Sequence, residues 1–162
     1  MTKFLFLFTL LLLSRISFAE IVSNPFEYVL KNSEFGKENG TTRFYLDIND
    51  DKKLDLIAGE RWSGNAGGTY FIFLKEEQGH RLLGSIFLHP QGFQLLQKKH
   101  NGIRDILNYH HLSAFDGNLY TYHFDGKSYV ETSRKHIESK DFNSAIKPIS
   151  VKSLDAGPGE KW

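Results

Sequence analysis

Short segments rich in β-branched and aromatic residues constrain the fold of this chain more than any other feature. They include "TYFIFL" (69–74), "RLLGSIFL" (81–88) and "LYTYHF" (119–124), and glycine or aspartate separates them. Such residues favour extended strands, whereas glycine and aspartate favour turns. From Thr41 onward we therefore expect a mainly β chain.

Two local patterns predict β-hairpins. In "YHFDGKSYV" the pair Asp125-Gly126 separates two alternating segments and predicts a type I′ turn. In "FLKEEQGHRLLG" a longer turn is expected around Glu76 to Gly79, with Gly79 in a left-handed conformation.

A short helix is expected before the strands. In "SNPFEYVLKNSEFG" either Ser23 or Asn24 can cap its start, Pro25 suits its first position and Gly36 lies beyond its end. Apolar residues at helical spacing share one face.

A repeat with a period of 50 residues is suggested by three aligned pairs of residues. Asp55 aligns with Asp105, and the same offset aligns the pairs Gly67/Gly117 and Tyr70/Tyr120. The fold we expect is therefore two divergent strand-loop-hairpin units, about 41–90 and 91–140, packed as a small sheet, a sandwich or a partial propeller. Coincidence between two β-hairpin segments is the alternative.

The first 19 residues have the pattern of a secretory signal peptide. Lys3 precedes an apolar run of about ten residues, too short to span a bilayer, and Ser17-Phe18-Ala19 resembles a cleavage site. We expect cleavage after Ala19 and a periplasmic or secreted protein. The remaining 143 residues suit a single β-rich domain at 20–154 followed by a mobile tail at 155–162.

Composition limits the classes of partner. Without Lys3 and Arg15 the chain has 18 basic and 19 acidic residues, so its charge does not favour nucleic acid or an anionic membrane surface. No membrane insertion is expected after cleavage. The chain has no cysteine, which excludes disulfides and a lipoprotein anchor.

Residues 47–55, here called the acidic loop, carry the clearest chemical pattern. Alternate positions can direct oxygen atoms into one concavity, and Ca²⁺ binds six to eight such ligands at about 2.3–2.6 Å. The expected ligands are the side chains of Asp47, Asn49, Asp51 and Asp55 and the carbonyl of Lys53. The alternative is a solvated turn closed by its own Asp and Asn side chains.

The acidic loop differs from an EF-hand, because Lys52 and Ala58 occupy the positions of its glycine and its bidentate glutamate. "DINDDKKLDLIAG" instead resembles the aspartate-rich loops between strands of FG-GAP and VCBS-type repeats of exported bacterial proteins. That resemblance implies a structural calcium ion. In the aligned segment Lys99 replaces a ligand with a positive charge, so we expect no metal there.

The connection "GERWSGNAGGTY" (59–70) is a candidate for partner recognition. It is rich in glycine and small polar residues, and Arg61 and Trp62 are of types enriched at binding hot spots. With Asn65 they form the predicted partner-binding set. The alternative is a plain connection with Trp62 packed on the core.

Catalytic and zinc sites have weaker support. His110 and His111 point to opposite faces if they lie in a strand, so they would not share one ion. Asp105 could pair with His110 or His123, but no nucleophile motif accompanies them. We predict that the chain is not an enzyme.

The function expected from these patterns is an exported, calcium-braced β module that binds a protein or glycan. Two alternatives remain. One is a periplasmic inhibitor or immunity protein that blocks a toxin or lysozyme, and the other is a periplasmic hydrolase.

Overall fold

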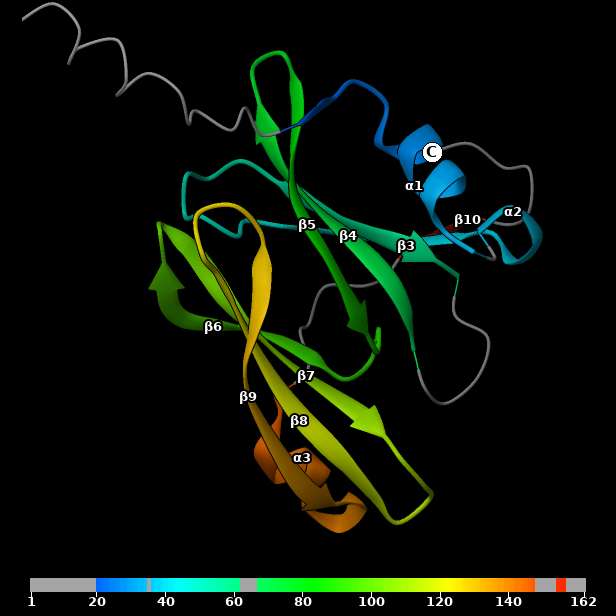
Figure 1. Cartoon of the computed structure of the whole chain (residues 1–162), viewed down its shortest axis with the longest axis vertical. Helices are drawn as coiled ribbons and strands as arrows, with labels where there is room; N and C mark the ends of the chain where they lie inside the picture. Colours follow the sequence, from blue (N-terminus) through cyan, green and yellow to red (C-terminus); the bar gives the residue numbers. More distant parts are fainter. Residues whose placement is uncertain (1–19, 35, 62–66, 148–153, 157–162) are drawn as a thin grey trace, which may run out of the picture.

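The computed structural model describes residues 20–34, 36–61, 67–147 and 154–156, which form two antiparallel sheets (Figure 1). The strands of the six-stranded sheet A are, in spatial order, β1 (Ile21–Val22), β5 (Gly79–Leu88), β4 (Gly68–Glu76), β3 (Asp55–Glu60), β2 (Thr41–Leu46) and β10 (Leu154–Ala156). The strands of the four-stranded sheet B are β6 (Phe93–His100), β7 (Ile103–His111), β8 (Asp116–Phe124) and β9 (Tyr129–Glu138). The prediction of a mainly β chain is confirmed.

Each sheet is built around four strands that follow one another in the sequence. In sheet A, β2 to β5 pair successively, and the short β1 and β10 extend the two edges. In sheet B, β6 to β9 pair successively. All these pairs are antiparallel, so local connections suffice to build both sheets.

The helices are short. α1 (Pro25–Asn32) agrees with the predicted helix, and its cap is Asn24, whose side-chain oxygen accepts the N–H of Glu27 at 3.3 Å. Pro25 occupies the first turn, where its missing N–H costs nothing. The remaining helical segments are α2 (Gly36–Asn39), the 3₁₀ turn η1 (Ser139–Asp141) and α3 (Phe142–Ala145).

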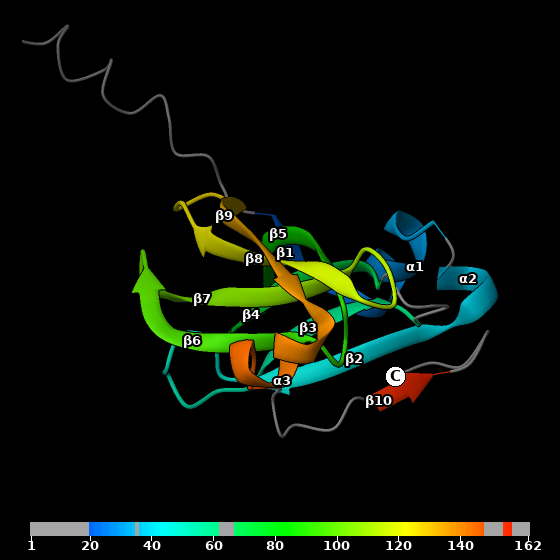
Figure 2. The ribbon, with the colours of Figure 1, turned by 90° about the horizontal axis from the view of Figure 1, so that it is seen from below.

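The main hydrophobic core lies between the two sheets. Sheet A contributes Phe44, Ile57 and Ile72, and sheet B contributes Phe93 and Ile106, all at most 2% exposed. Two smaller clusters lie elsewhere, one joining α1 to sheet A and one joining α3 to sheet B. Figure 2 shows these two helices on different sides of the molecule.

Both predicted hairpins are present. The turn around Glu76 to Gly79 agrees with the prediction, with Gly79 at a positive φ of 141°, whereas the turn at Asp125-Gly126 differs. β8 pairs with β9, yet four residues connect them and Asp125 is not among the residues with positive φ. Its carboxylate instead accepts the N–H groups of Lys127 and Ser128, both at 2.8 Å. The two-residue turn with positive φ at both positions is Asn101-Gly102, between β6 and β7. The predicted type I′ turn at Asp125-Gly126 is therefore wrong in type.

The two ends of the chain are described only in part. The predicted signal peptide, residues 1–19, lies outside the described residues. The predicted tail begins at Asp155, and β10, which includes Asp155 and Ala156, pairs with β2. The Thr42 hydroxyl donates to Asp155 at 2.8 Å.

Candidate functional site: the acidic loop and the contact between the sheets

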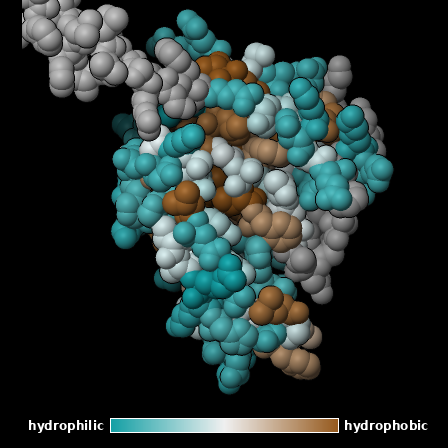
Figure 3. All heavy atoms as spheres, viewed as in Figure 1, coloured by the Kyte–Doolittle hydropathy of each residue, from teal (hydrophilic) through white to brown (hydrophobic). Residues whose placement is uncertain are grey.

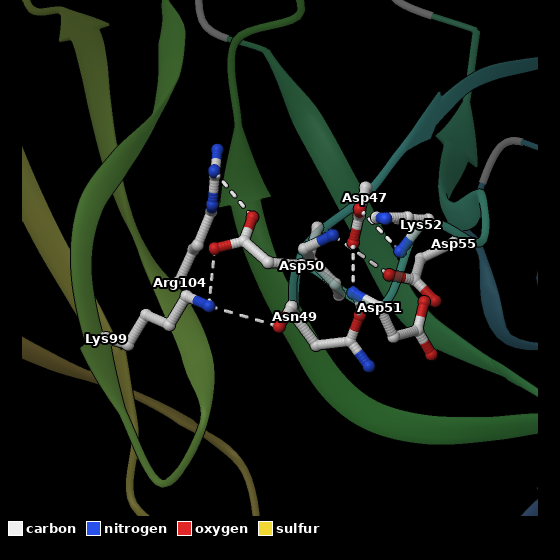
Figure 4. A network of polar contacts seen from close by, with 9 residues as sticks. Asp47, Asn49, Asp50, Asp51, Lys52, Asp55, Lys99 and Arg104 are labelled. Atoms are coloured by element: carbon white, nitrogen blue, oxygen red, sulfur yellow. Dashed lines mark hydrogen bonds and ion pairs between the residues drawn. The ribbon is translucent and has the colours of Figure 1, made fainter.

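The acidic loop connects β2 to β3 and closes on itself through backbone N–H groups (Figure 4). The Asp47 carboxylate accepts the N–H of Asp51 at 3.1 Å and the N–H of Lys52 at 2.9 Å. Asn49 accepts the same Asp51 N–H at 3.1 Å, and the Asp51 carboxylate accepts the Lys53 N–H at 2.8 Å. The Lys53 N–H and then the Asn49 side chain lower the pKa of Asp51. The loop shape is therefore fixed by its own Asp and Asn side chains.

Two residues of the acidic loop have left-handed backbone conformations. Asp50 has φ 64° and Lys52 has φ 68°. Aspartate tolerates this region better than lysine, for which glycine would be the unstrained choice. The loop thus keeps strain at Lys52, the position at which an EF-hand has glycine.

Asp55, the first residue of β3, is the buried anchor of the loop. Its side chain is fully buried and accepts the N–H of Ile48 at 2.9 Å and the N–H of Lys75, in β4, at 2.7 Å. Burial raises the pKa of Asp55 to about 6, and the charges of Asp51 and Asp47 add to the rise, while the two N–H groups oppose it. Asp55 therefore links the acidic loop to the neighbouring strand β4.

Asp50 joins the acidic loop to sheet B. Its carboxylate lies 2.5 Å from Lys99 Nζ and 2.6 Å from Arg104 Nη2 (Figure 4). The Lys99 ammonium also donates to the Asn49 carbonyl at 3.1 Å. The backbone N–H of Arg104 donates to the backbone carbonyl of Ile48 at 2.9 Å. The hydrogen bond from Lys99 is the largest cause of the lowered pKa of Asp50. This inter-sheet contact was not predicted, because it depends on how the two sheets meet.

The acidic loop has the donor chemistry of a calcium site, since carboxylate, amide and carbonyl oxygens are hard ligands. Figure 4 shows Asp47, Asn49, Asp51 and Asp55 on the same short loop, with Asp50 directed toward sheet B. Burial, and after it the nearby carboxylates, raise the pKa of Asp55, so the charged form of Asp55 is disfavoured. A cation bound at the loop would stabilise that charged form. In the part of the chain that the structure describes, no three or more Asp, Glu or His side chains are arranged to hold a metal ion.

Of the predicted partner-binding set, only Arg61 belongs to the described residues. Its backbone N–H donates to the Gly40 carbonyl at 2.8 Å, and its side chain, half exposed, lies 3.9 Å from the Asp155 carboxylate. Trp62 and Asn65 lie outside the described residues. Arg61 thus sits beside β10, at the edge of sheet A.

The histidines near the end of β7 have separate surroundings. The His110 ring lies 4.6 Å from the Phe87 ring, and its Nε2–H donates to the Phe87 carbonyl at 3.2 Å. The His111 ring lies 4.6 Å from the Tyr109 ring and 5.7 Å from the His89 ring. Burial lowers the pKa of His110, and it lowers that of His89 to about 4.

Asp105 has a partner that the sequence did not indicate. Its carboxylate, 2% exposed, lies 2.7 Å from Nδ1 of His100, whose ring lies 4.4 Å from that of His123. The hydrolase alternative paired Asp105 with His110 or His123 instead. The Asn101-Gly102 turn brings His100 to Asp105, and this Asn-Gly pair is the sequence signal that could have identified the contact.

The end of the β7–β8 hairpin exposes large apolar side chains. Leu112 is 60% exposed and Phe115 is 82% exposed. Figure 3 shows apolar side chains at this end of sheet B, which Figure 1 places far from α1. The Ser113 hydroxyl donates to Asp116 and accepts the Phe115 N–H at 3.1 Å, so local hydrogen bonds order the tip.

Within the described ranges, no helix has both the length and the apolar character needed to cross a membrane. Comparisons with known protein families, with curated proteins and with solved structures found no match to this chain.

Proposed function

We propose that this chain is an exported binding module, acting in the periplasm or outside the cell, whose partner is a protein. The observation that carries the proposal is the exposure of Leu112 and Phe115 at the end of the β7–β8 hairpin. Exposed aromatic and aliphatic side chains on an ordered tip supply apolar area to an interface at a small entropic cost. The tip, residues 112–115, is thus the principal contact surface.

The predicted partner loop forms a second part of this proposal. Arg61 presents a half-exposed guanidinium beside β10, and Trp62 and Asn65 follow it in the sequence. Arginine and tryptophan are common hot-spot residues. A partner that contacts both the tip and Arg61 would bind residues of both sheets, which favours a protein over a small glycan.

We also propose that a calcium ion braces the acidic loop. The residues that would hold it are Asp47, Asn49, Asp51, Asp55 and the carbonyl of Lys53. The ion would supply positive charge where the buried Asp55 carboxylate faces Asp51 and Asp47, whose charges raise its pKa after burial does. An ion at this position would stiffen the loop that contacts Lys99 and Arg104.

The arrangement of strands supports the proposal of two related units. β5 (Gly79–Leu88) and β9 (Tyr129–Glu138) have the same length and are 50 residues apart, and each ends a run of four successive strands. Asp55 opens β3 and Asp105 lies near the start of β7, and both are buried. This order is compatible with a divergent pair of the FG-GAP or VCBS type, in which each unit supplies one sheet.

Photo-crosslinking tests the binding proposal. A benzoylphenylalanine replaces Phe115 in the exported chain, and the matched control places it at Lys127, an exposed residue of the β8–β9 connection. We expect a discrete protein adduct from position 115 and none from 127. The adduct should disappear when excess unlabelled chain competes, and should persist when the competitor carries Leu112→Ser and Phe115→Ser. Equal adducts at both positions would contradict the proposal.

Calorimetric titration tests the brace. We expect calcium to bind the purified chain and to raise its melting temperature, and Asp47→Asn/Asp51→Asn to abolish both effects. Glu76→Gln/Glu77→Gln removes the same number of carboxylates from the β4–β5 hairpin and serves as the control. Heat of binding that is equal in the two double variants would refute the site.

One alternative is favoured by a specific feature. The β7–β8 hairpin ends in apolar side chains at one extremity of the molecule, which suits insertion into a cleft (Figure 1). An inhibitor or immunity protein that blocks a toxin or lysozyme would use such a tip. Inhibition of a lysozyme or toxin by the native chain, lost in Phe115→Ser, would select this alternative over a scaffold or receptor role.

A further inference from the structure

A pair of histidines on sheet B has the geometry of a metal site that is separate from the acidic loop. His100 is the last residue of β6, and His123 lies next to the end of β8. Their ring centroids are 4.4 Å apart, with 34° between the ring planes. Asp105, in the intervening strand β7, lies 2.7 Å from Nδ1 of His100.

The carboxylate behind His100 orients this ring as a ligand. A neutral imidazole that donates its Nδ1 proton to a carboxylate keeps the lone pair of Nε2 free for a metal. Asp105 is 2% exposed, whereas the His100 side chain is 33% exposed, so the carboxylate lies beneath a ring that solvent can reach. Metal-binding histidines commonly have such a carboxylate partner.

The backbone holds the two histidines together. Asn101 and Gly102 form a tight turn with φ 50° and 80° immediately after His100. The Asn101 side-chain amide donates to the carbonyl of Phe124, the residue after His123, at 2.9 Å. This hydrogen bond links the turn that carries one histidine to the strand that carries the other, so the pair is preorganised.

The ring separation indicates the coordination angle. A metal–nitrogen bond of about 2.1 Å places an imidazole centroid about 3.2 Å from the ion, so two rings at about a right angle have centroids about 4.5 Å apart. A tetrahedral angle would separate them by about 5.2 Å. The observed 4.4 Å therefore suits two neighbouring positions of a square or tetragonal site. Copper(II) and nickel(II) prefer that geometry, and copper(II) binds nitrogen ligands most tightly of the divalent first-row metals.

We propose that His100 and His123 bind a divalent transition metal, with copper(II) preferred, and that Asp105 positions His100 for this role. Water or a group from a bound partner completes the coordination. Only two protein side chains contact the ion. The site therefore does not require a group of three acidic or histidine ligands, of which the described residues contain none.

A second histidine pair provides a rival within the same molecule. His89 and His111 have ring centroids 5.7 Å apart, but His89 is 7% exposed and its Nδ1 accepts the Gln91 N–H at 3.3 Å. A single exposed histidine, His136, lies 3.7 Å from the Asp116 carboxylate, and within the described part of the chain no second histidine ring packs against it. These two groups supply matched controls.

The test is a copper(II) titration of the chain purified without a polyhistidine tag, followed by isotope-edited NMR. Copper below one equivalent should broaden the signals of His100, His123 and the Asn101-Gly102 turn first, because the ion is paramagnetic. Broadening that begins at His89 and His111, at His136 or at the amino terminus would overturn the proposal.

Variants then assign the roles. We expect His100→Ala and His123→Ala each to weaken copper binding by about tenfold or more, while His111→Ala and His136→Ala leave it within about twofold. Asp105→Asn should weaken binding by about 10- to 100-fold without moving the site, as loss of an outer-shell partner does. Far-ultraviolet circular dichroism checks that each variant is folded, and His123→Gln replaces His123→Ala if the latter is not. Equal affinity in the His100, His123 and His136 variants would refute the assignment.

Discussion

The acidic loop and residues 97–105, which lie 50 positions further along the chain, hold a buried aspartate in two chemical ways. Each has a residue with positive φ at the equivalent position, Lys52 with 68° and Gly102 with 80°. Each also has a buried aspartate at the equivalent position, Asp55 and Asp105. Asp55 accepts two backbone N–H groups, whereas Asp105 is paired with the imidazole of His100.

The two segments keep their backbone conformation by different interactions. In the acidic loop the Asp and Asn side chains hold the backbone, so the loop can be long and still be ordered. In the second segment the strands continue to His100 and resume at Ile103, so two residues alone make the turn. The first segment is a closed loop, and the second is a two-residue turn between strands, with His100 paired to Asp105.

The largest expected effect comes from removing the two buried carboxylates in turn. Asp55→Ala leaves the N–H groups of Ile48 and Lys75 without their acceptor, and we expect it to lower the free energy of unfolding by about 4 kcal/mol. Asp105→Ala removes one hydrogen bond to a side chain that can turn to solvent, and should cost about 2 kcal/mol. Urea denaturation measures both values. A larger loss for Asp105→Ala would break the comparison.

The pH dependence of stability tests the buried Asp55 carboxylate next. Because the pKa of Asp55 is raised to about 6 in the folded chain from 3.8, its contribution to the free energy of unfolding is fully present below pH 3.8. That contribution decreases as the pH rises through 6, by about 3 kcal/mol in total. Asp55→Asn should remove this slope, and bound calcium should reduce it. A slope that is the same in the variant would contradict this assignment.

His89 requires that the slope be measured as a difference between wild type and variant. Its pKa is lowered to about 4 by burial, so its contribution to stability is present above pH 6.5 and lost as the pH falls toward 4. The Asp55 and His89 contributions therefore have opposite signs in overlapping pH ranges. His89→Gln in the same background should make the Asp55 slope visible directly.

Local signals in the sequence predict much of this fold. The helix follows from the Asn24 cap and Pro25, because both act on the first turn alone. The strands follow from alternating aromatic and β-branched residues, which suit a half-buried sheet. The β2–β3 connection and the oxygen-rich character of the acidic loop were also visible in the sequence.

Other features required the tertiary structure or were misread. Asp50 was not assigned a role, since its partners Lys99 and Arg104 come from the other sheet. The contact between His100 and Asp105 was missed for a different reason. The alignment with the acidic loop directed attention to metal ligands in this segment, although the Asn101-Gly102 pair is a strong signal for a two-residue hairpin turn.

A smaller effect is expected from the contact that joins the two segments. Asp50→Asn should lower the melting temperature less than Asp105→Ala does, because the Asp50 side chain is 43% exposed and solvent screens its charge. The loss should diminish at high salt. A double-mutant cycle with Lys99→Met tests the pairing, and Arg134→Met with Glu131→Gln gives the matched exposed pair within one strand. Strict additivity of Asp50→Asn and Lys99→Met would show that the ion pair adds nothing.

The smallest effect comes from exchanging the residues at two positions with positive φ, Lys52 and Gly102. Lys52→Gly relieves a left-handed lysine, and after the entropy of the unfolded glycine is included we expect a gain of about 0.5 kcal/mol. Gly102→Lys should cost a similar amount through backbone strain alone, because nothing lies within 4 Å of a Cβ placed at Gly102. Chemical denaturation measures the free energy of unfolding of each variant and of the double variant. Changes of opposite sign mean that the two segments share a left-handed position, whereas a loss in both means that the Lys52 side chain contributes to the acidic loop in a way that its backbone conformation does not explain.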